Sequence, residues 1–183
     1  MVTKAGFVGL AGRPNVGKST LVNQVIGEKV VIVSDRPQTT RRAIRGIAMR
    51  EETQLVMVDL PGFQRPRDLL TERMQKRVER ELSDSDAVLF VLNGEEGMGA
   101  GDRFIAELLK LSSRPVLIAV NKEDRLNRSR TMTSLLAAEE LGLDAEIFPI
   151  SAKTGAGVEP LVARLAELMP EGPFLFDLSL IHI

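Results

Sequence analysis

A glycine-rich segment near the N-terminus has the residue types and the spacing that bind phosphate groups. It fits the pattern G-x-x-x-x-G-K-[ST] followed by one more hydroxyl residue, and it consists of Gly12, Arg13, Pro14, Asn15, Val16, Gly17, Lys18, Ser19 and Thr20. Glycines allow a tight turn in which successive backbone N–H groups face inward around phosphate oxygens. The lysine adds a mobile positive charge for the β- and γ-phosphates, and the Ser19 hydroxyl is a ligand for Mg²⁺. The segment therefore predicts binding of a nucleoside triphosphate with Mg²⁺.

The flanking residues supply the elements that this pattern needs. Residues 7–11 form an apolar run that predicts a buried strand, and residues 19–26 have helical spacing that ends at Gly27. A loop between a strand and a helix places bound phosphates at the positive end of the helix dipole. An ordinary glycine turn with an exposed lysine is the alternative, and it does not account for both flanking elements.

The rest of the chain alternates apolar runs with helical segments, which is typical of a parallel sheet built from βα units. We expect further strands at residues 30–34, 43–49, 53–58, 87–92, 115–120 and 145–150, and helices at residues 70–82, 102–111, 129–141 and 158–169. The pattern predicts an α/β fold of the P-loop NTPase class, with a mostly parallel central sheet and helices on both faces. The sequence PEGP at residues 170–173 is the boundary signal, so we expect a domain over residues 1–170 and a linker or truncated tail over residues 171–183.

Two polar loops are expected to respond to the γ-phosphate. Asp59 directly follows a predicted strand in the pattern D-x-x-G, where its carboxylate suits the water shell of Mg²⁺ and the Gly62 N–H suits the γ-phosphate. Thr40 lies in the polar loop of residues 35–42, and a threonine there can close over Mg²⁺ when a triphosphate is bound. The adjacent Thr39 is the alternative for that role.

The segment NKED at residues 121–124 follows another predicted strand and points to guanine as the base. The Asp124 carboxylate can accept hydrogen bonds from guanine N1–H and from the exocyclic amino group, which adenine lacks. The stem of Lys122 could lie over the base, and Asn121 could connect this loop to the phosphate loop. A short segment after the last strand supports this assignment, because a backbone N–H of its alanine could reach guanine O6; it consists of Ser151, Ala152 and Lys153.

Composition narrows the class of protein. The chain has 183 residues, 44% of them hydrophobic, and a net charge of −1, which suits one globular domain without a strongly basic surface. It contains no cysteine, which excludes a disulfide framework, and the sequence shows no signal peptide and no integral membrane segment, so we expect a cytoplasmic protein. Five arginines flank the two polar loops and form either a solvated face or a surface that a partner reads; they are Arg41, Arg42, Arg45, Arg65 and Arg67.

Together these motifs resemble the Era family of bacterial ribosome-assembly GTPases. The resemblance covers residues 4 to about 176 and rests on the phosphate loop, on P-Q-T-T-R at residues 37–41, on Gly101-Asp102 and on residues 170–173. It implies GTP and GDP as ligands, Mg²⁺ and GTP hydrolysis. For a full-length protein it implies binding of 16S rRNA, a role in assembly of the small (30S) ribosomal subunit, and a cytoplasmic location that includes the inner face of the membrane.

The chain departs from that family at two places. Leu60 stands where threonine is usual, and residues 178–183 match nothing in the family. Era proteins continue into a KH-type RNA-binding domain, and we expect this domain to be absent from the present chain.

For catalysis the sequence predicts in-line attack of water on the γ-phosphate, with Lys18, Thr40, Gly62 and Asn15 as the catalytic residues. Phe63 stands where Ras-like enzymes carry a glutamine, and a phenyl ring cannot hydrogen-bond water. The resemblance implies that Asn15 holds K⁺ beside the phosphates. The alternative function is that of a related ribosome- or tRNA-linked GTPase acting as a nucleotide-gated binding module with little turnover. A P-loop kinase or ATPase is disfavoured by the guanine motif.

Overall fold

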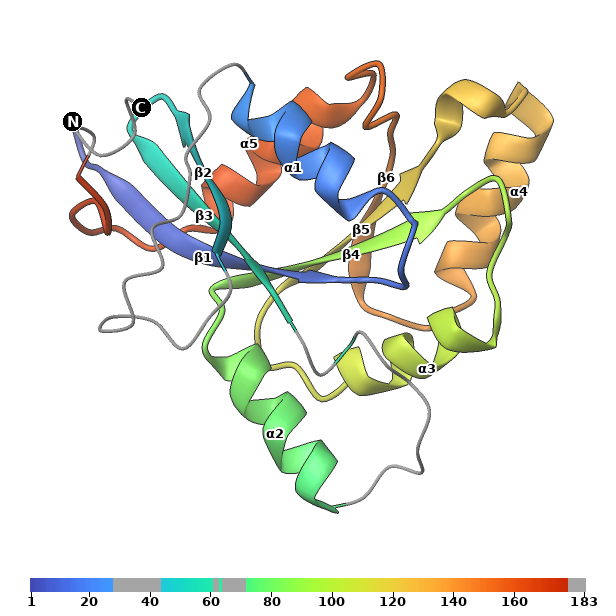
Figure 1. Cartoon of the computed structure of the whole chain (residues 1–183), viewed down its shortest axis with the longest axis horizontal. Coiled ribbons are helices and arrows are strands. Elements are labelled where there is room, and N and C mark those ends of the chain that lie inside the picture. Colours follow the sequence, from blue (N-terminus) through green and yellow to red (C-terminus); the bar gives the residue numbers. More distant parts are fainter. Residues whose placement is uncertain (28–43, 61–62, 64–71, 178–183) are drawn as a thin grey trace.

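The computed structural model of the chain describes residues 1–27, 44–60, 63 and 72–177. Within these residues six strands form one sheet in the order β2-β3-β1-β4-β5-β6 (Figure 1). The strands are β1 Lys4–Ala11, β2 Ile44–Arg50, β3 Thr53–Asp59, β4 Ala87–Asn93, β5 Val116–Asn121 and β6 Ala145–Pro149. The pairs β1–β3, β1–β4, β4–β5 and β5–β6 are parallel, and β2 runs antiparallel to β3. The predicted α/β fold with a mostly parallel sheet is confirmed.

Helices cover both faces of this sheet. They are α1 Lys18–Ile26, α2 Glu72–Ser83, α3 Ala100–Leu109, α4 Arg128–Glu139 and α5 Val158–Leu168, with a short 3₁₀ turn, η2, over Glu123–Arg125. Helices α1 and α5 share one apolar core with the sheet, and α2, α3 and α4 share the other (Figure 1). Every residue of β3, β4 and β5 is buried, as expected for strands that are covered on both faces. Among the described helices, none has the length and apolarity needed to cross a membrane.

The apolar runs and helical segments of the sequence locate these elements to within a few residues. The strand expected at residues 30–34 lies outside the described residues. The helix expected from residue 102 begins two residues earlier, at Ala100. It starts there because the Asp102 carboxylate accepts a hydrogen bond of 2.8 Å from the Gly99 N–H and caps the first turn. A carboxylate in the first turn also interacts favourably with the helix dipole.

The edge strand β2 contains an irregularity at Arg45. Ile44 pairs with Val58 and Gly46 pairs with Met57, so Arg45 is an extra residue opposite β3. Such a bulge bends the strand and turns the extra side chain away from its regular alternation.

The residues after α5 return to the sheet. The Gly172 N–H donates to the Thr3 carbonyl at 3.0 Å, and Glu171 bridges to Lys4. Further on, the buried Gln54 side chain accepts the N–H groups of Leu175 and Phe176 at 2.9 and 3.0 Å and donates to the Phe176 carbonyl at 2.9 Å. The domain boundary at residue 170 stays a prediction, but residues 171–176 are held against strands β1 and β3.

Candidate nucleotide-binding site

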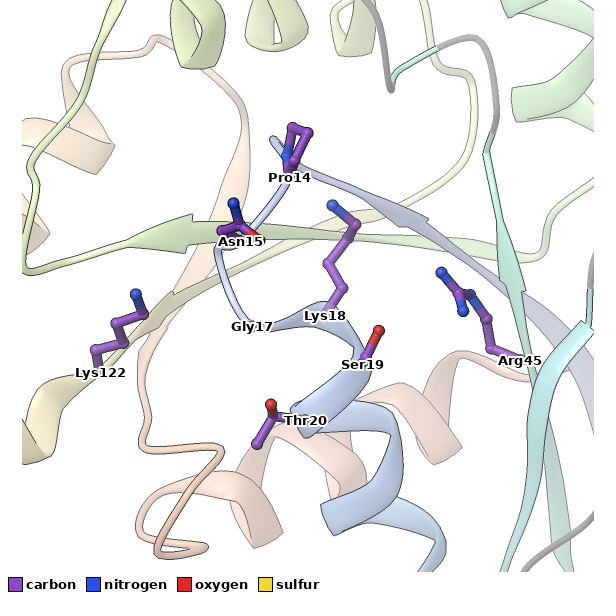
Figure 2. A pocket seen from close by; sticks show the side chains of 8 residues that line it. All are labelled: Pro14, Asn15, Gly17, Lys18, Ser19, Thr20, Arg45 and Lys122. Atoms are coloured by element: carbon purple, nitrogen blue, oxygen red, sulfur yellow. The ribbon is translucent and has the colours of Figure 1, made fainter.

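The phosphate loop and the loop after β5 meet at a pocket at the carboxyl ends of the parallel strands, where ligands of open α/β sheets bind. The pocket has a volume of about 610 Å³. Figure 2 shows that the phosphate loop and the start of α1 supply one side, with Lys122 and Arg45 on opposite flanks. Its lining residues are Pro14, Asn15, Gly17, Lys18, Ser19, Thr20, Arg45 and Lys122.

The backbone of the phosphate loop has a conformation that its glycines make possible. Gly12 and Gly17 have φ angles of 146° and 101°, and Asn15 has a φ of 64° in the left-handed region that asparagine tolerates. A Cβ at Gly12 would lie 2.6 Å from the Val91 carbonyl oxygen. A Cβ at Gly17 would collide with the Asn121 side chain. The loop can therefore lie against β4 and β5 only with glycine at these positions.

The Lys18 side chain extends from the first turn of α1 across the phosphate loop (Figure 2). Its amine donates hydrogen bonds to the carbonyl oxygens of Gly12 at 2.6 Å and Arg13 at 2.7 Å. Burial lowers the pKa of the Lys18 amine, the Asp59 carboxylate acts to raise it, and the Arg45 guanidinium acts to lower it. A cation is therefore held at the centre of the loop, close to where the phosphates of a nucleotide would lie.

Asp59 is the last residue of β3, and only one of its two carboxylate oxygens has a hydrogen-bond partner among the described residues. Its Oδ2 accepts a hydrogen bond of 2.5 Å from Arg45 Nε, whereas Oδ1 is buried and has no hydrogen-bond partner among the described residues. A buried carboxylate oxygen without a partner is costly, and a hydrated cation or water would satisfy it. This oxygen and the Ser19 hydroxyl are hard donors of the kind that Mg²⁺ prefers, so the residues present fit this ion.

Arg45 was not recognised as a site residue from the sequence. We expected it on a solvated or partner-reading face with four other arginines, but the structure places it in the pocket and pairs it with Asp59. The other four, Arg41, Arg42, Arg65 and Arg67, lie outside the described residues. The position of Arg45 depends on the bulge in β2, for which the sequence gives no clear signal.

Asn121 connects the phosphate loop to the loop after β6, and it does so from a nearly buried position of 3% exposure. Its Nδ2 donates to the Val16 carbonyl at 2.8 Å, and its Oδ1 accepts from the Ala152 N–H at 2.9 Å. The connection to the phosphate loop is the one expected from the sequence. The Ala152 N–H donates to Asn121, and its expected contact with guanine O6 stays a prediction.

Asp124 is held by a serine for which the sequence suggested only a supporting role. The buried Ser151 hydroxyl donates to Asp124 Oδ1 at 2.7 Å and accepts the Thr154 N–H at 3.1 Å. The Glu123 N–H donates to the Ile150 carbonyl at 3.0 Å, which ties η2 to the end of β6. Asp124 and Lys153 are exposed, and Lys122, with a φ of 70°, lines the pocket. The two expected base-binding segments therefore lie together.

Arg13 anchors the outer side of the phosphate loop. Its Nε donates to Asp102 Oδ1 at 2.9 Å, and Asp102 is fully buried. The other oxygen of Asp102 caps α3 through Gly99, so this carboxylate has a partner at each oxygen. A buried charge that is paired and hydrogen-bonded in this way fixes geometry, because removal of either partner leaves the other unsatisfied. Arg13 and Asp102 both lie in motifs recognised from the sequence, but no pattern indicated that they contact each other.

Three expected site residues, Thr39, Thr40 and Gly62, lie outside the described residues. Phe63 is described and is 1% exposed, packed in the core with α2 and α3. Its ring therefore belongs to the core of the domain and not to the pocket lining.

Comparison with known proteins identifies relatives of this arrangement. Residues 7–122 match the family described as 50S ribosome-binding GTPase. The chain is 43% identical over 181 residues to the GTPase Era of Alkaliphilus metalliredigens, and the aligned residues cover 99% of this chain and 61% of the relative. It is 45% identical over 185 residues to the GTPase Era of a Nocardioides species, which covers 96% of this chain and 59% of the relative.

Two solved structures of Era are similar to the whole described fold. An Era variant from Aquifex aeolicus bound to GDP·AlF4⁻ has a TM-score of 0.74 at 34% identity and covers 96% of this chain and 60% of that chain. An Era complex with MgGDPNP and nucleotides 1506–1542 of 16S ribosomal RNA has a TM-score of 0.75 at 34% identity and covers 97% of this chain and 61% of that chain. The chain thus spans about 60% of the length of these relatives.

The pKa of Lys18 gives a pH-dependent prediction for this pocket. Because burial lowers this pKa, the amine should lose its proton at a lower pH than an ordinary lysine. Anionic phosphates favour the charged amine, so bound GDP should raise the pKa, and affinity should fall as the pH rises through the lowered value. The check is an NMR titration of ¹³C-labelled lysine ε-carbons, with the signal assigned through Lys18→Arg. A signal that titrates like an ordinary lysine in the free protein, or that GDP does not move, would contradict the prediction.

Proposed function

The chain belongs to the 50S ribosome-binding GTPase family and, within it, to the Era GTPases, and we propose that it binds GTP and GDP with Mg²⁺ and hydrolyses GTP as a molecular switch. The observation that supports this proposal is the pair of hydrogen bonds made by Asn121, which connects the phosphate loop to the two proposed base-binding segments. We assign this function to a domain over residues 1–170.

The nucleotide would lie with its phosphates in the loop and its base over η2. The backbone N–H groups of residues 12–20 would surround the phosphates, with Lys18 beside them. Ser19, Asp59 and Thr40 would hold Mg²⁺, which shields the phosphate charge when bound. Asp124, oriented by Ser151, would accept the guanine donors, and Lys122 would lie over the base. Ala152 would keep Asn121 in place, and Lys153 would border the base at the surface.

Hydrolysis would proceed by in-line attack of water on the γ-phosphate. Lys18 and the loop N–H groups stabilise the charge that develops on the phosphate oxygens, and the Gly62 N–H is proposed to contact the γ-phosphate. Phe63 is packed in the core, so it does not orient the attacking water. We propose that a K⁺ ion held near Asn15 supplies further positive charge for the transition state; Asn15 is an exposed loop residue that lines the pocket on the side of Lys122 (Figure 2).

We also propose a partner for the full-length protein. A relative of 34% identity has been solved with MgGDPNP and a segment of 16S ribosomal RNA. We propose that this chain, as the nucleotide-binding part of an Era protein, controls binding of 16S rRNA and assembly of the small ribosomal subunit in the cytoplasm, including the inner face of the membrane.

The test of base recognition is Asp124→Asn. The variant should lose about 100-fold or more in GTP affinity, because it removes two charge-assisted hydrogen bonds worth roughly 3 kcal/mol together. It should gain affinity for xanthosine triphosphate, whose carbonyl accepts a hydrogen bond from the new amide. Calorimetry with both nucleotides measures this, and Glu123→Gln is the matched control, since it neutralises the adjacent carboxylate. GTP binding by Asp124→Asn within a few-fold of wild type would refute the assignment.

A second prediction concerns the monovalent cation. If Asn15 helps to hold K⁺ beside the phosphates, phosphate release from GTP should be about tenfold or more faster in K⁺ than in Na⁺ at equal ionic strength. Asn15→Gly should remove most of this difference, because glycine keeps the left-handed backbone at residue 15 and lacks the amide. GDP affinity of the variant serves as the control and should change little. Equal rates in the two salts, or a preference for K⁺ that survives Asn15→Gly, would leave Asn15 only its role in the turn.

A further inference from the structure

Arg45 lies in the pocket but belongs to neither the phosphate loop nor the base-binding segments. It is the extra residue of the bulge in β2, between the pairs Ile44–Val58 and Gly46–Met57. Bulges next to active sites commonly re-aim a side chain. Figure 2 shows the Arg45 guanidinium turned from β2 into the pocket, on the side of Lys18 and Ser19.

The contact between Arg45 and Asp59 is asymmetric. The guanidinium donates through Nε to Asp59 Oδ2 at 2.5 Å, and the other carboxylate oxygen, Oδ1, is buried without a hydrogen-bond partner among the described residues. The exposed fractions of the two side chains are 45% and 9%, so the arginine approaches from the solvent side of a nearly buried acid. Charge-assisted bonds of this kind are short and directional.

Strand pairing fixes the backbone of Asp59, whereas the orientation of its carboxylate depends on side-chain contacts. Asp59 ends β3 and is paired in register with Leu10 of the neighbouring β1. Lys18, the other cation nearby, directs its amine to the carbonyl oxygens of Gly12 and Arg13. Arg45 is therefore the cation that holds Asp59 among the described residues.

We propose that Arg45 is a positioning residue that holds Asp59 by Oδ2 and so presents Oδ1 to the hydrated Mg²⁺ of a bound nucleotide. The inference rests on the proposed function. Residues that orient metal-binding side chains typically change metal affinity by about 10- to 100-fold when they are mutated. An arginine that only formed a surface ion pair would change it very little.

The test measures how Mg²⁺ retains the nucleotide. The dissociation rate of a fluorescent GDP is recorded over a series of Mg²⁺ concentrations for wild type and Arg45→Gln. The half-saturating Mg²⁺ concentration should rise about tenfold in the variant. The dissociation rate in excess EDTA is recorded for each variant as its own baseline without Mg²⁺, so that a direct effect of the Arg45 charge on the nucleotide does not enter the Mg²⁺ dependence.

Two further variants separate positioning from a general loss of charge. Arg50→Gln removes an arginine from the same strand, where Arg50 pairs with Glu159, and it should leave the half-saturating Mg²⁺ concentration unchanged. Arg45→Lys keeps a charged donor of different geometry and should raise the concentration less than Arg45→Gln does. If Arg45→Gln does not fold, as judged by thermal denaturation, Arg45→Lys decides the question through the same measurement.

The outcomes are distinct. A raised half-saturating Mg²⁺ concentration in the Arg45 variants, with Arg50→Gln unchanged, supports the proposal. An unchanged half-saturating Mg²⁺ concentration would mean that Arg45 and Asp59 form only a surface ion pair. A lowered concentration would mean that the Arg45 guanidinium competes with Mg²⁺. Either result overturns the proposal. A wild-type protein that binds no guanine nucleotide at any Mg²⁺ concentration would instead overturn the proposed function.

Discussion

The hydrogen bonds of the Asn121 side chain set the distance between the phosphate loop and the loop after β6. The amide spans the carbonyl oxygen of Val16 and the N–H of Ala152 from a position that is nearly buried. A buried amide that lost either partner would leave polar groups unsatisfied, at a cost of about 1–3 kcal/mol for each group. Gly17 is required beside it, because a Cβ there would collide with the amide. One residue thus places the phosphate loop relative to the proposed base-binding segment after β6.

Other side chains of the candidate site are held by partners on neighbouring elements. Asp102 holds the phosphate loop through Arg13 and also caps α3, so the loop and that helix share a buried carboxylate. Arg45 holds Asp59, and the Ser151 hydroxyl holds Asp124. Asp59 and Asp124, for which we propose roles at the nucleotide, therefore each have a hydrogen-bond partner on a different element. Such support is what keeps the site in a defined geometry before a ligand binds.

Sequence reasoning predicted the features that depend on local patterns. The apolar runs located strands such as β4 and β5, because strands covered on both faces read as continuous apolar segments. The phosphate loop and the guanine segment were recognised because their spacing is local. The pocket position of Arg45, the hydrogen bond from Ser151 to Asp124 and the pairing of Arg13 with Asp102 were missed, since a bulge, a side-chain rotamer and a contact over 89 residues leave no periodic signal. The roles of Thr40 and Gly62 stay predictions, because both lie outside the described residues.

The most direct test of this account is the GDP affinity of Asn121→Ala compared with that of Asn93→Ala, measured by calorimetry. Asn93 is the matched control, because it is a buried asparagine at the end of the adjacent β4 whose amide oxygen accepts the N–H groups of Glu95 and Glu96 and has no bond to the phosphate loop. The account predicts a loss of about 30-fold or more in GDP affinity for Asn121→Ala, from two lost hydrogen bonds and the partners left unsatisfied. Asn93→Ala should stay within a few-fold of wild type. Equal GDP affinities in the two variants would contradict the claim that Asn121 positions the site.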